Sequence, residues 1–192
     1  MTWLSLRTAG LLTWAVLALG ACSSATRHPD VDVDAVTAFE LSGRVAVKVD
    51  DRGYTAGLKW RHREASDDLW LYSPVGSVVA TVHSGVDGAR LTEANGKVHE
   101  SADVQSLTRE FLGWDLPLSG LSHWVRARPA PAIQVQRQER DQRSRLTLLT
   151  QNEWDIRYSE YQDTATLPAG MNLQYRNLRI KLIINEWRLP AT

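Results

Sequence analysis

Alternating apolar and polar residues dominate the chain from residue 39 onward. Every second residue between Phe39 and Val49 is apolar or glycine, and a second alternating run covers Tyr54 to Trp60 after the turn sequence Asp51-Arg52-Gly53. A period of two places successive side chains on opposite faces of a strand. The pattern therefore predicts an antiparallel hairpin with one buried face.

Four shorter alternating segments follow, separated by turn sequences such as Pro74-Val75-Gly76 and Ala94-Asn95-Gly96. We predict strands at roughly 68–73, 77–83, 88–93 and 96–100. Apolar residues then take helical spacing over 102–112, behind the possible caps Ser101 and Asp103, and again after Pro117. Two short helices are therefore expected in the middle of the chain.

Strands resume after residue 131, at about 133–139, 145–150, 153–160, 171–176 and 179–187. A sheet of about eleven strands must curl, and two helices are too few to cover it if it lies flat. We therefore predict a mainly β fold with a small helical lid: an open antiparallel half-barrel of about eleven strands covering an apolar cavity. Residues 39–192 are expected to form this single domain.

The first 21 residues have the features of a bacterial lipoprotein signal. Arg7 precedes an apolar run from Ala9 to Leu19 that is too short to span a bilayer, and Leu19-Gly20-Ala21-Cys22 resembles a lipoprotein processing site. Cleavage before Cys22 leaves 171 of the 192 residues, with a lipid on the Cys22 thiol as the anchor. Ser23 favours sorting to the outer membrane, and residues 22–38 are expected to be a solvated, lipidated tether. An ordinary secretory signal with an incidental cysteine is the alternative.

Composition excludes several kinds of chemistry. The mature chain has 21 basic and 22 acidic residues, so nucleic acid is not expected as a partner. Cys22 is the only cysteine, and its lipidation leaves no thiol for a disulfide, a nucleophile or a metal ligand. The five histidines lack metal-ligand spacing, and we expect His62, His83 and His99 to be solvated at strand ends. No metal, cofactor or catalytic residue is predicted, and the sequences typical of hydrolases and nucleotide-binding loops are absent.

Several motifs occur in an order that resembles the LolB family of outer-membrane lipoprotein receptors. They are Phe39-x-Leu41-x-Gly43-Arg44, Pro74-Val75-Gly76, Gly113-x-x-Leu116-Pro117-Leu118, and Gln151-Asn152-x-Trp154-x-Ile156-x-Tyr158. The resemblance covers essentially Phe39 to Trp187. It implies an open half-barrel that is anchored in the outer membrane, faces the periplasm, and carries lipoproteins without catalysis.

The resemblance also implies the partners. A monomeric receptor of this family accepts triacylated lipoproteins from a soluble periplasmic carrier similar to LolA and inserts them into the outer-membrane lipid. Exposing about 40 methylenes of three acyl chains to water would cost roughly 30 kcal/mol, so a protein cavity must shield them. A lipocalin-like module that binds a small apolar ligand is the alternative function.

The resemblance assigns two kinds of site residue. Val75 takes the place of an exposed apolar residue on a loop that enters the membrane, although it could instead be a turn residue packed on its own hairpin. The acyl-chain cavity is expected to be lined by alternating apolar residues of the sheet and lid, which could equally be ordinary core. These residues are Val45, Val47, Leu58, Trp60, Leu69, Leu71, Leu116, Leu121 and Trp124.

One segment departs from the family pattern. The family tends to have a glycine and an apolar neighbour after the lid tryptophan, where this chain has Ala127 between Arg126 and Arg128. The geometry and charge at the end of the lid therefore cannot be carried over from the resemblance.

Overall fold

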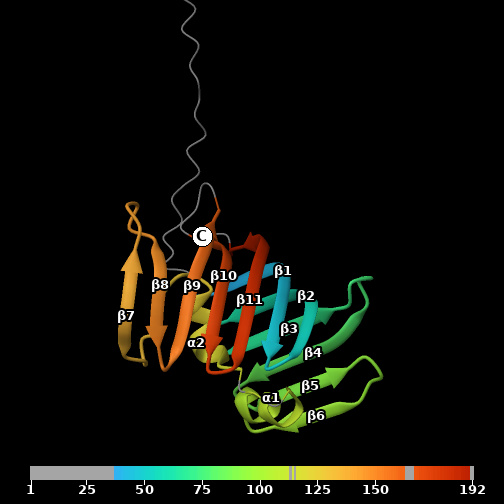
Figure 1. Cartoon of the computed structure of the whole chain (residues 1–192). Coiled ribbons are helices and arrows are strands. Elements are labelled where there is room, and N and C mark those ends of the chain that lie inside the picture. The colour runs from blue at the N-terminus through green and yellow to red at the C-terminus, as the bar shows by residue number, and fades with distance from the viewer. Residues whose placement is uncertain (1–36, 113, 115, 163–166, 191–192) are drawn as a thin grey trace, which may run out of the picture.

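Eleven strands form one antiparallel sheet in the computed structural model, which describes residues 37–112, 114, 116–162 and 167–190 (Figure 1). The strands are β1 (Phe39–Val49), β2 (Arg52–Arg63), β3 (Ser66–Tyr72), β4 (Val78–Gly85), β5 (Gly88–Glu93), β6 (Val98–Ser101), β7 (Val135–Arg140), β8 (Leu146–Gln151), β9 (Trp154–Tyr161), β10 (Pro168–Tyr175) and β11 (Leu178–Arg188). Two helices, α1 (Val104–Leu112) and α2 (Leu118–Trp124), lie between β6 and β7. The predicted signal, Cys22 and nearly all of the predicted tether lie outside the described residues.

The sheet consists of two meanders joined by one long-range pair. Its strand order is β6-β5-β4-β3-β2-β1-β11-β10-β9-β8-β7, so only the pairing of β1 with β11 joins strands that are not neighbours in the chain. In this order β6 and β7 are the two edges and do not pair with each other. The predicted open antiparallel half-barrel with two short helices is therefore confirmed.

Because Gly43 has no side chain, β1 and β11 can approach each other closely where the sheet bends. The register of the two strands shifts between Ser42 and Gly43. A Cβ atom on Gly43 would lie 2.0 Å from the Ile183 carbonyl oxygen, so no other residue fits without moving the backbone. Such an irregularity increases local twist and bending.

The concave inner face of the sheet holds the core, and both helices lie against it (Figure 1). Side chains such as Trp60, Ile156 and Met171 from the strands, with Leu107 and Trp124 from the helix segments, are wholly buried there. Every residue of the main hydrophobic cluster and those packed on it lies between Phe39 and Leu189. Among the described residues, this core draws on β1 to β5 and on β8 to β11, together with both helix segments.

The two ends of the sheet are named here after one residue at each. We call one the Phe39 end, where β1 begins and the β2–β3 and β4–β5 turns lie. The other is the Val75 end, which holds the β1–β2, β3–β4, β8–β9 and β10–β11 turns. The strand registers place these turns together, and the Asn177 side-chain amide donates to Asp50 Oδ1 at 2.7 Å across the Val75 end.

Candidate functional site

The inner face and its helical cover bring together the residues predicted to line a cavity. Trp60 and Trp124 are wholly buried, and Leu58 and Leu69 are nearly so. The other five are partly buried against the same cluster: Val45, Val47, Leu71, Leu116 and Leu121. Helices and sheet pack directly on one another here, so these side chains form a filled core in this structure. Contact with a bound acyl chain stays a prediction for each of them.

A buried glutamine holds α2 and the segment after it against the sheet. The Trp124 indole N–H and the Ala130 backbone N–H both donate to Gln151 Oε1, each at 2.8 Å. The Gln151 amide donates in turn to the carbonyl oxygens of Ala130, at 3.0 Å, and Ile133, at 2.6 Å. The Tyr158 hydroxyl donates to the Trp124 carbonyl at 2.9 Å. Because every polar atom of the Gln151 side chain is satisfied, its burial stabilises the closed arrangement.

Sequence reasoning assigned no role to Gln151, although the signal was present. In β8 the amide side chain of Gln151 comes two residues after Leu149. Both therefore lie on the face of the strand that the period-two pattern predicts to be apolar. A polar side chain at an inner-face position needs buried partners. The identity of those partners depends on chain segments that only the folded structure brings together.

The other helix is anchored separately. The Asp103 carboxylate accepts a 2.7 Å hydrogen bond from the Ser106 backbone N–H, which confirms Asp103 as a cap, and this bond holds the Asp103 pKa below its usual value. Phe111 packs on the His99 ring with centroids 3.7 Å apart. The Thr108 hydroxyl accepts from the Leu116 N–H at 2.9 Å, which ties α1 to the start of α2.

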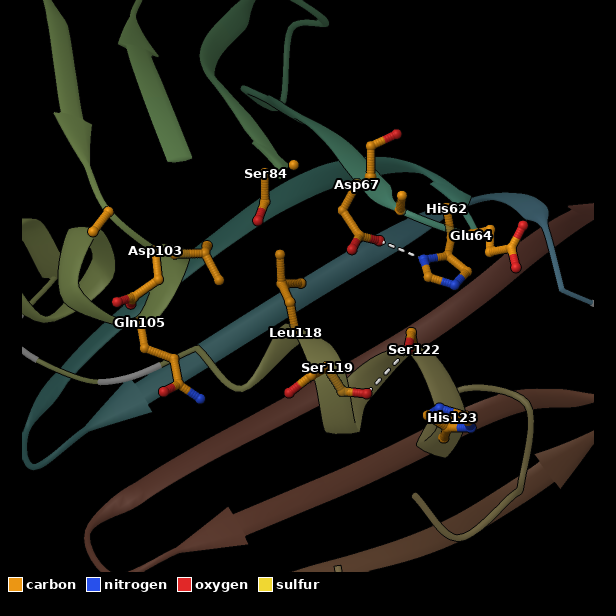
Figure 2. Close-up of a pocket in the computed structure, with 15 residues that line it drawn as sticks. His62, Glu64, Asp67, Ser84, Asp103, Gln105, Leu118, Ser119, Ser122 and His123 are labelled. Carbon is orange, nitrogen blue, oxygen red and sulfur yellow. Dashed lines mark hydrogen bonds and ion pairs between the residues drawn. The ribbon is translucent and has the colours of Figure 1, made fainter. Parts of the chain in front are cut away.

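A polar hollow of about 550 Å³ lies at the Phe39 end, between the two helices and the β2–β3 and β4–β5 turns (Figure 2). Asp67 is its central group, because Oδ1 accepts from the Trp60 indole N–H and lies 2.7 Å from His62 Nδ1. The Ser122 hydroxyl donates to the Ser119 carbonyl and not to a histidine, so no nucleophile is activated there. No cluster of metal-binding side chains occurs among the described residues.

The expectation of solvated histidines is wrong at two positions. The side chains of His62 and His99 are only 13% and 9% exposed, and each pairs with a carboxylate, Asp67 or Glu93. Both residues lie on the inner face of the sheet, where the Phe39 ring packs on His62 and Phe111 of α1 packs on His99. His83 is exposed, as expected, and lies 2.7 Å from an Asp68 oxygen.

The end of the lid is built from the residues that depart from the family pattern. Arg126 is buried, and this burial lowers its pKa. Its Nε donates to the Ser122 carbonyl at 2.8 Å, and its guanidinium lies 5.9 Å from the Phe39 ring centre. Ala127 has φ of +56°, a left-handed conformation that favours glycine. A glycine at this position would adopt the same conformation without strain.

Val75 projects from the β3–β4 turn at the Val75 end, and 87% of its surface is exposed. The turn is closed by hydrogen bonds from Ser73 N–H to the Ser77 carbonyl and from Gly76 N–H to the Ser73 carbonyl. Gly76 has φ of +85°, which glycine adopts without strain. With this exposure the Val75 side chain makes little contact with its own hairpin, and its entry into the membrane stays a prediction.

The fold class is shared with solved structures of low sequence identity. A domain from Vibrio parahaemolyticus named for outer membrane lipoprotein sorting aligns with a TM-score of 0.51, at 9% identity, over 84% of this chain and 88% of that chain. A DUF1329 family protein from Desulfovibrio piger gives the same TM-score and identity over 83% and 88%. At this identity the likeness defines a class of open, helix-covered β-sheet proteins and nothing further.

Sequence comparison places the chain within that class. A family model described as "Outer membrane lipoprotein LolB" matches residues 37–187. Proteins named outer-membrane lipoprotein LolB from Azoarcus sp. and Chromobacterium violaceum are 32% and 33% identical, over 89% and 93% of this chain and 90% and 97% of theirs. The chain belongs to the LolB family. It is an outer-membrane lipoprotein of the lipoprotein-localisation system and not an enzyme.

Within the described residues, neither helix is long and apolar enough to cross a membrane.

Proposed function

We propose that this protein is the outer-membrane receptor that accepts triacylated lipoproteins from a soluble periplasmic carrier similar to LolA and inserts them into the outer membrane. A lipid on Cys22 anchors it there, and residues 22–38 tether a monomeric domain facing the periplasm. The observation that carries the proposal is an open sheet whose apolar inner face is covered, within the described part of the chain, by two short helices.

Acyl chains enter, in this proposal, between the helices and the sheet. The interior is packed by side chains such as Trp60, Trp124 and Leu107, and a close-packed core has no room for an acyl chain. The lid must therefore move outward when cargo binds. The core side chains then exchange their contacts with one another for contacts with the cargo, so the apolar surface stays shielded from water.

Delivery is proposed to use Val75. An exposed valine at a projecting turn can enter the outer part of a bilayer at little cost, and it brings the Val75 end of the sheet to the lipid. The acyl chains then pass from the inner face to the membrane without crossing water. Transfer needs no nucleotide if each successive site binds the chains more tightly than the one before.

A two-stage transfer experiment tests the proposal. The domain is mixed with carrier loaded with a triacylated lipoprotein, the loaded domain is isolated, and liposomes are then added. We expect the cargo to move to the domain and then to the liposomes. Stable retention of the acyl chains with no delivery would instead support a lipocalin-like binding module, and failure of a folded domain to take up cargo would contradict the receptor proposal.

A further inference from the structure

The geometry points to a binding surface for anionic phospholipid headgroups on the outer face of the sheet. We define the cationic patch as five exposed side chains on the outer faces of β1, β9 and β11: Arg44, Lys48, Arg157, Arg179 and Lys181. This inference concerns how the domain sits on the membrane, and it stands apart from cargo transfer.

The strand registers bring these cations together. Lys48 lies directly opposite Arg179 on the neighbouring strand. Asn172, on β10, lies opposite Lys181 on one side and Arg157 on the other. Like charges directly opposite each other destabilise a sheet. An arrangement that opposes folding in this way is explained if an anionic partner covers it.

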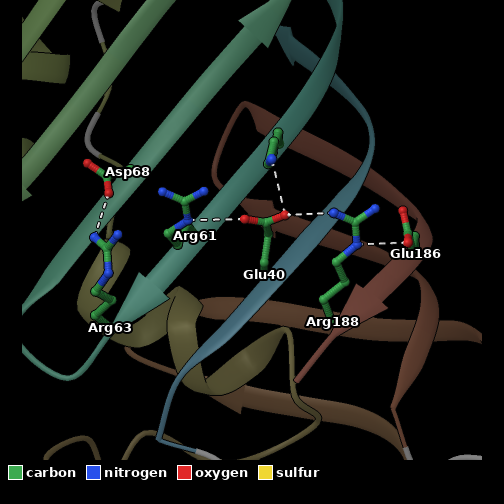
Figure 3. A network of polar contacts seen from close by, with 7 residues as sticks. Glu40, Arg61, Arg63, Asp68, Glu186 and Arg188 are labelled. Carbon is green, nitrogen blue, oxygen red and sulfur yellow. Dashed lines mark hydrogen bonds and ion pairs between the residues drawn. The ribbon is translucent and has the colours of Figure 1, made fainter. Parts of the chain in front are cut away.

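The cations on the outer face at the Phe39 end differ from those of the patch, because they are paired with carboxylates (Figure 3). Glu40 accepts from Arg61 at 3.0 Å and also pairs with Lys59 at 3.1 Å and Arg188 at 3.5 Å. Burial alone raises the Glu40 pKa, but the hydrogen bonds from Lys59 and Arg61 outweigh it and hold the pKa below its usual value. Arg63 has its own partner, Asp68, at 2.8 Å.

In the patch, by contrast, none of the five cations has a carboxylate within ion-pair distance among the described residues. A hollow of about 560 Å³ lies over the outer face of these strands. Its lining includes Ala46, Asn172, Gln174 and four of the five cations. Its one acidic side chain, Asp155, accepts a hydrogen bond from the Thr150 hydroxyl at 2.7 Å. The hollow thus offers several donors and excess positive charge to a phosphate group.

A membrane fits this surface better than a protein does. Protein interfaces bury an apolar or aromatic centre, whereas the strand registers place the charged Lys181 between Ala46 and Asn172 in the middle of the patch. Clusters of basic residues held near a membrane bind anionic lipid by charge alone. The patch also lies toward the same end of the sheet as Val75 and the exposed Tyr54 ring, which supply apolar contacts.

The length of the chain before the domain permits this orientation. Phe39 follows Cys22 by 17 positions, a maximum reach of about 56 Å at roughly 3.3 Å per position, whereas β1, with 11 residues, is about 36 Å long. A chain anchored at Cys22 can therefore allow the Val75 end and the patch to contact the membrane, although the domain begins at the opposite end.

Vesicle flotation of the unlipidated chain from Ser23 onward tests the inference without carrier or cargo. We expect binding to vesicles that contain phosphatidylglycerol, weak binding to phosphatidylcholine alone, and loss of the difference at high salt. The double substitution Lys48→Gln/Arg179→Gln should weaken partition into the anionic vesicles about 25-fold, since each cation contributes about fivefold. Thermal denaturation should show a fold that is intact or slightly more stable, because a like-charge pair is removed.

The matched control is Arg90→Gln/Arg143→Gln, which removes two exposed cations outside the patch. It should change partition less than about twofold. Equal losses in the two double variants, or unchanged binding in the Lys48/Arg179 variant, would overturn the inference. The inference would also be overturned if the Lys48/Arg179 variant kept vesicle binding but received no cargo from the carrier in the transfer experiment. The patch would then be a protein-docking surface. None of these three results would affect the receptor proposal, which the transfer experiment on the unsubstituted protein tests.

Discussion

Ala127 is a residue at which this chain carries backbone strain. It adopts φ of +56° directly after α2, in a turn where its N–H donates to the Trp124 carbonyl at 2.9 Å. For an L-residue this conformation costs on the order of 1–2 kcal/mol, whereas glycine adopts it freely. The strain lies where the lid ends, beside the buried Arg126.

We predict that Ala127→Gly raises the free energy of unfolding by about 0.5 to 1 kcal/mol, since relief of strain exceeds the added entropy of the unfolded chain. Urea denaturation measures the change. Ala94→Gly is the control, because Ala94 is an exposed turn residue without a positive φ, and it should be neutral or destabilising. A loss of stability at position 127 would show that the left-handed backbone is not strained in solution.

Val75 can be tested against a second valine of equal exposure. Val86, in the β4–β5 turn at the Phe39 end, is 86% exposed, against 87% for Val75. We predict that Val75→Glu leaves folding and cargo uptake intact and slows delivery to liposomes about tenfold, because a carboxylate resists entry into the bilayer. Val86→Glu should deliver normally. Equal delivery by both variants would remove the membrane role of Val75.

At the scale of elements, the lid is held by few contacts and each has a definite partner. Apolar spacing predicts both helices and the cap Asp103, because these depend on neighbours within a few residues. The same spacing cannot reveal that Gln151 binds the Trp124 side chain and the backbone of 130–133, because those groups meet only after folding. It also cannot reveal that Phe39 packs on His62 and that Phe111 packs on His99.

Gln151→Leu is predicted to lower the free energy of unfolding by about 3 kcal/mol, since it leaves the Trp124 indole N–H and backbone groups of Ala130 and Ile133 buried without partners. Thr150→Val is the comparison: it removes one outer-face hydrogen bond to Asp155 and should cost about 1 kcal/mol. Chemical denaturation followed by tryptophan fluorescence reports both. Equal losses would mean that Gln151 does not hold the lid.

The lid also carries a histidine whose charge is disfavoured. Burial, and then the nearby Arg126 and His62, lower the pKa of His123 in the folded state below its unfolded value near 6.5. As pH falls through that value, the unfolded state takes up a proton before the folded state does, so His123 makes the domain less stable in acid. Above that value this effect is absent.

We therefore predict that His123→Gln reduces the fall in Tm between neutral and mildly acidic pH, because glutamine does not titrate. His83→Gln is the control, since His83 is exposed and lies beside Asp68. The measurement is a Tm series across pH for the three proteins. If the His123 variant kept the same dependence of Tm on pH as the wild type, the acid sensitivity would come from other groups.

At the scale of the molecule, the period-two pattern predicts nearly all of the sheet, because each strand buries one face. The differences occur where long-range contacts override it. β10 begins at Pro168, earlier than the pattern indicates, with register shifts at Gly170 and a hydrogen bond from the Trp187 indole N–H to the Pro168 carbonyl. The β1–β11 pair joins segments some 140 residues apart, and no local pattern specifies it.

The curvature that results from these pairings gives the sheet a concave inner face. We propose that cargo acyl chains lie against this face when the lid moves. Leu71 and Tyr72 are adjacent on β3, and the strand registers place Leu71 on the inner face with Leu58 and Ala80, and Tyr72 on the outer face with Gly57. They form a matched pair of probe positions.

The most direct measurement places a photoreactive benzoylphenylalanine at residue 71 or 72 and illuminates each protein loaded with a triacylated lipoprotein. We predict a cross-link from position 71 to the lipid-bearing end of the cargo, none from position 72, and none when the cargo lacks its acyl chains. Equal cross-linking from both positions, or none from position 71 in a loaded complex, would contradict this prediction.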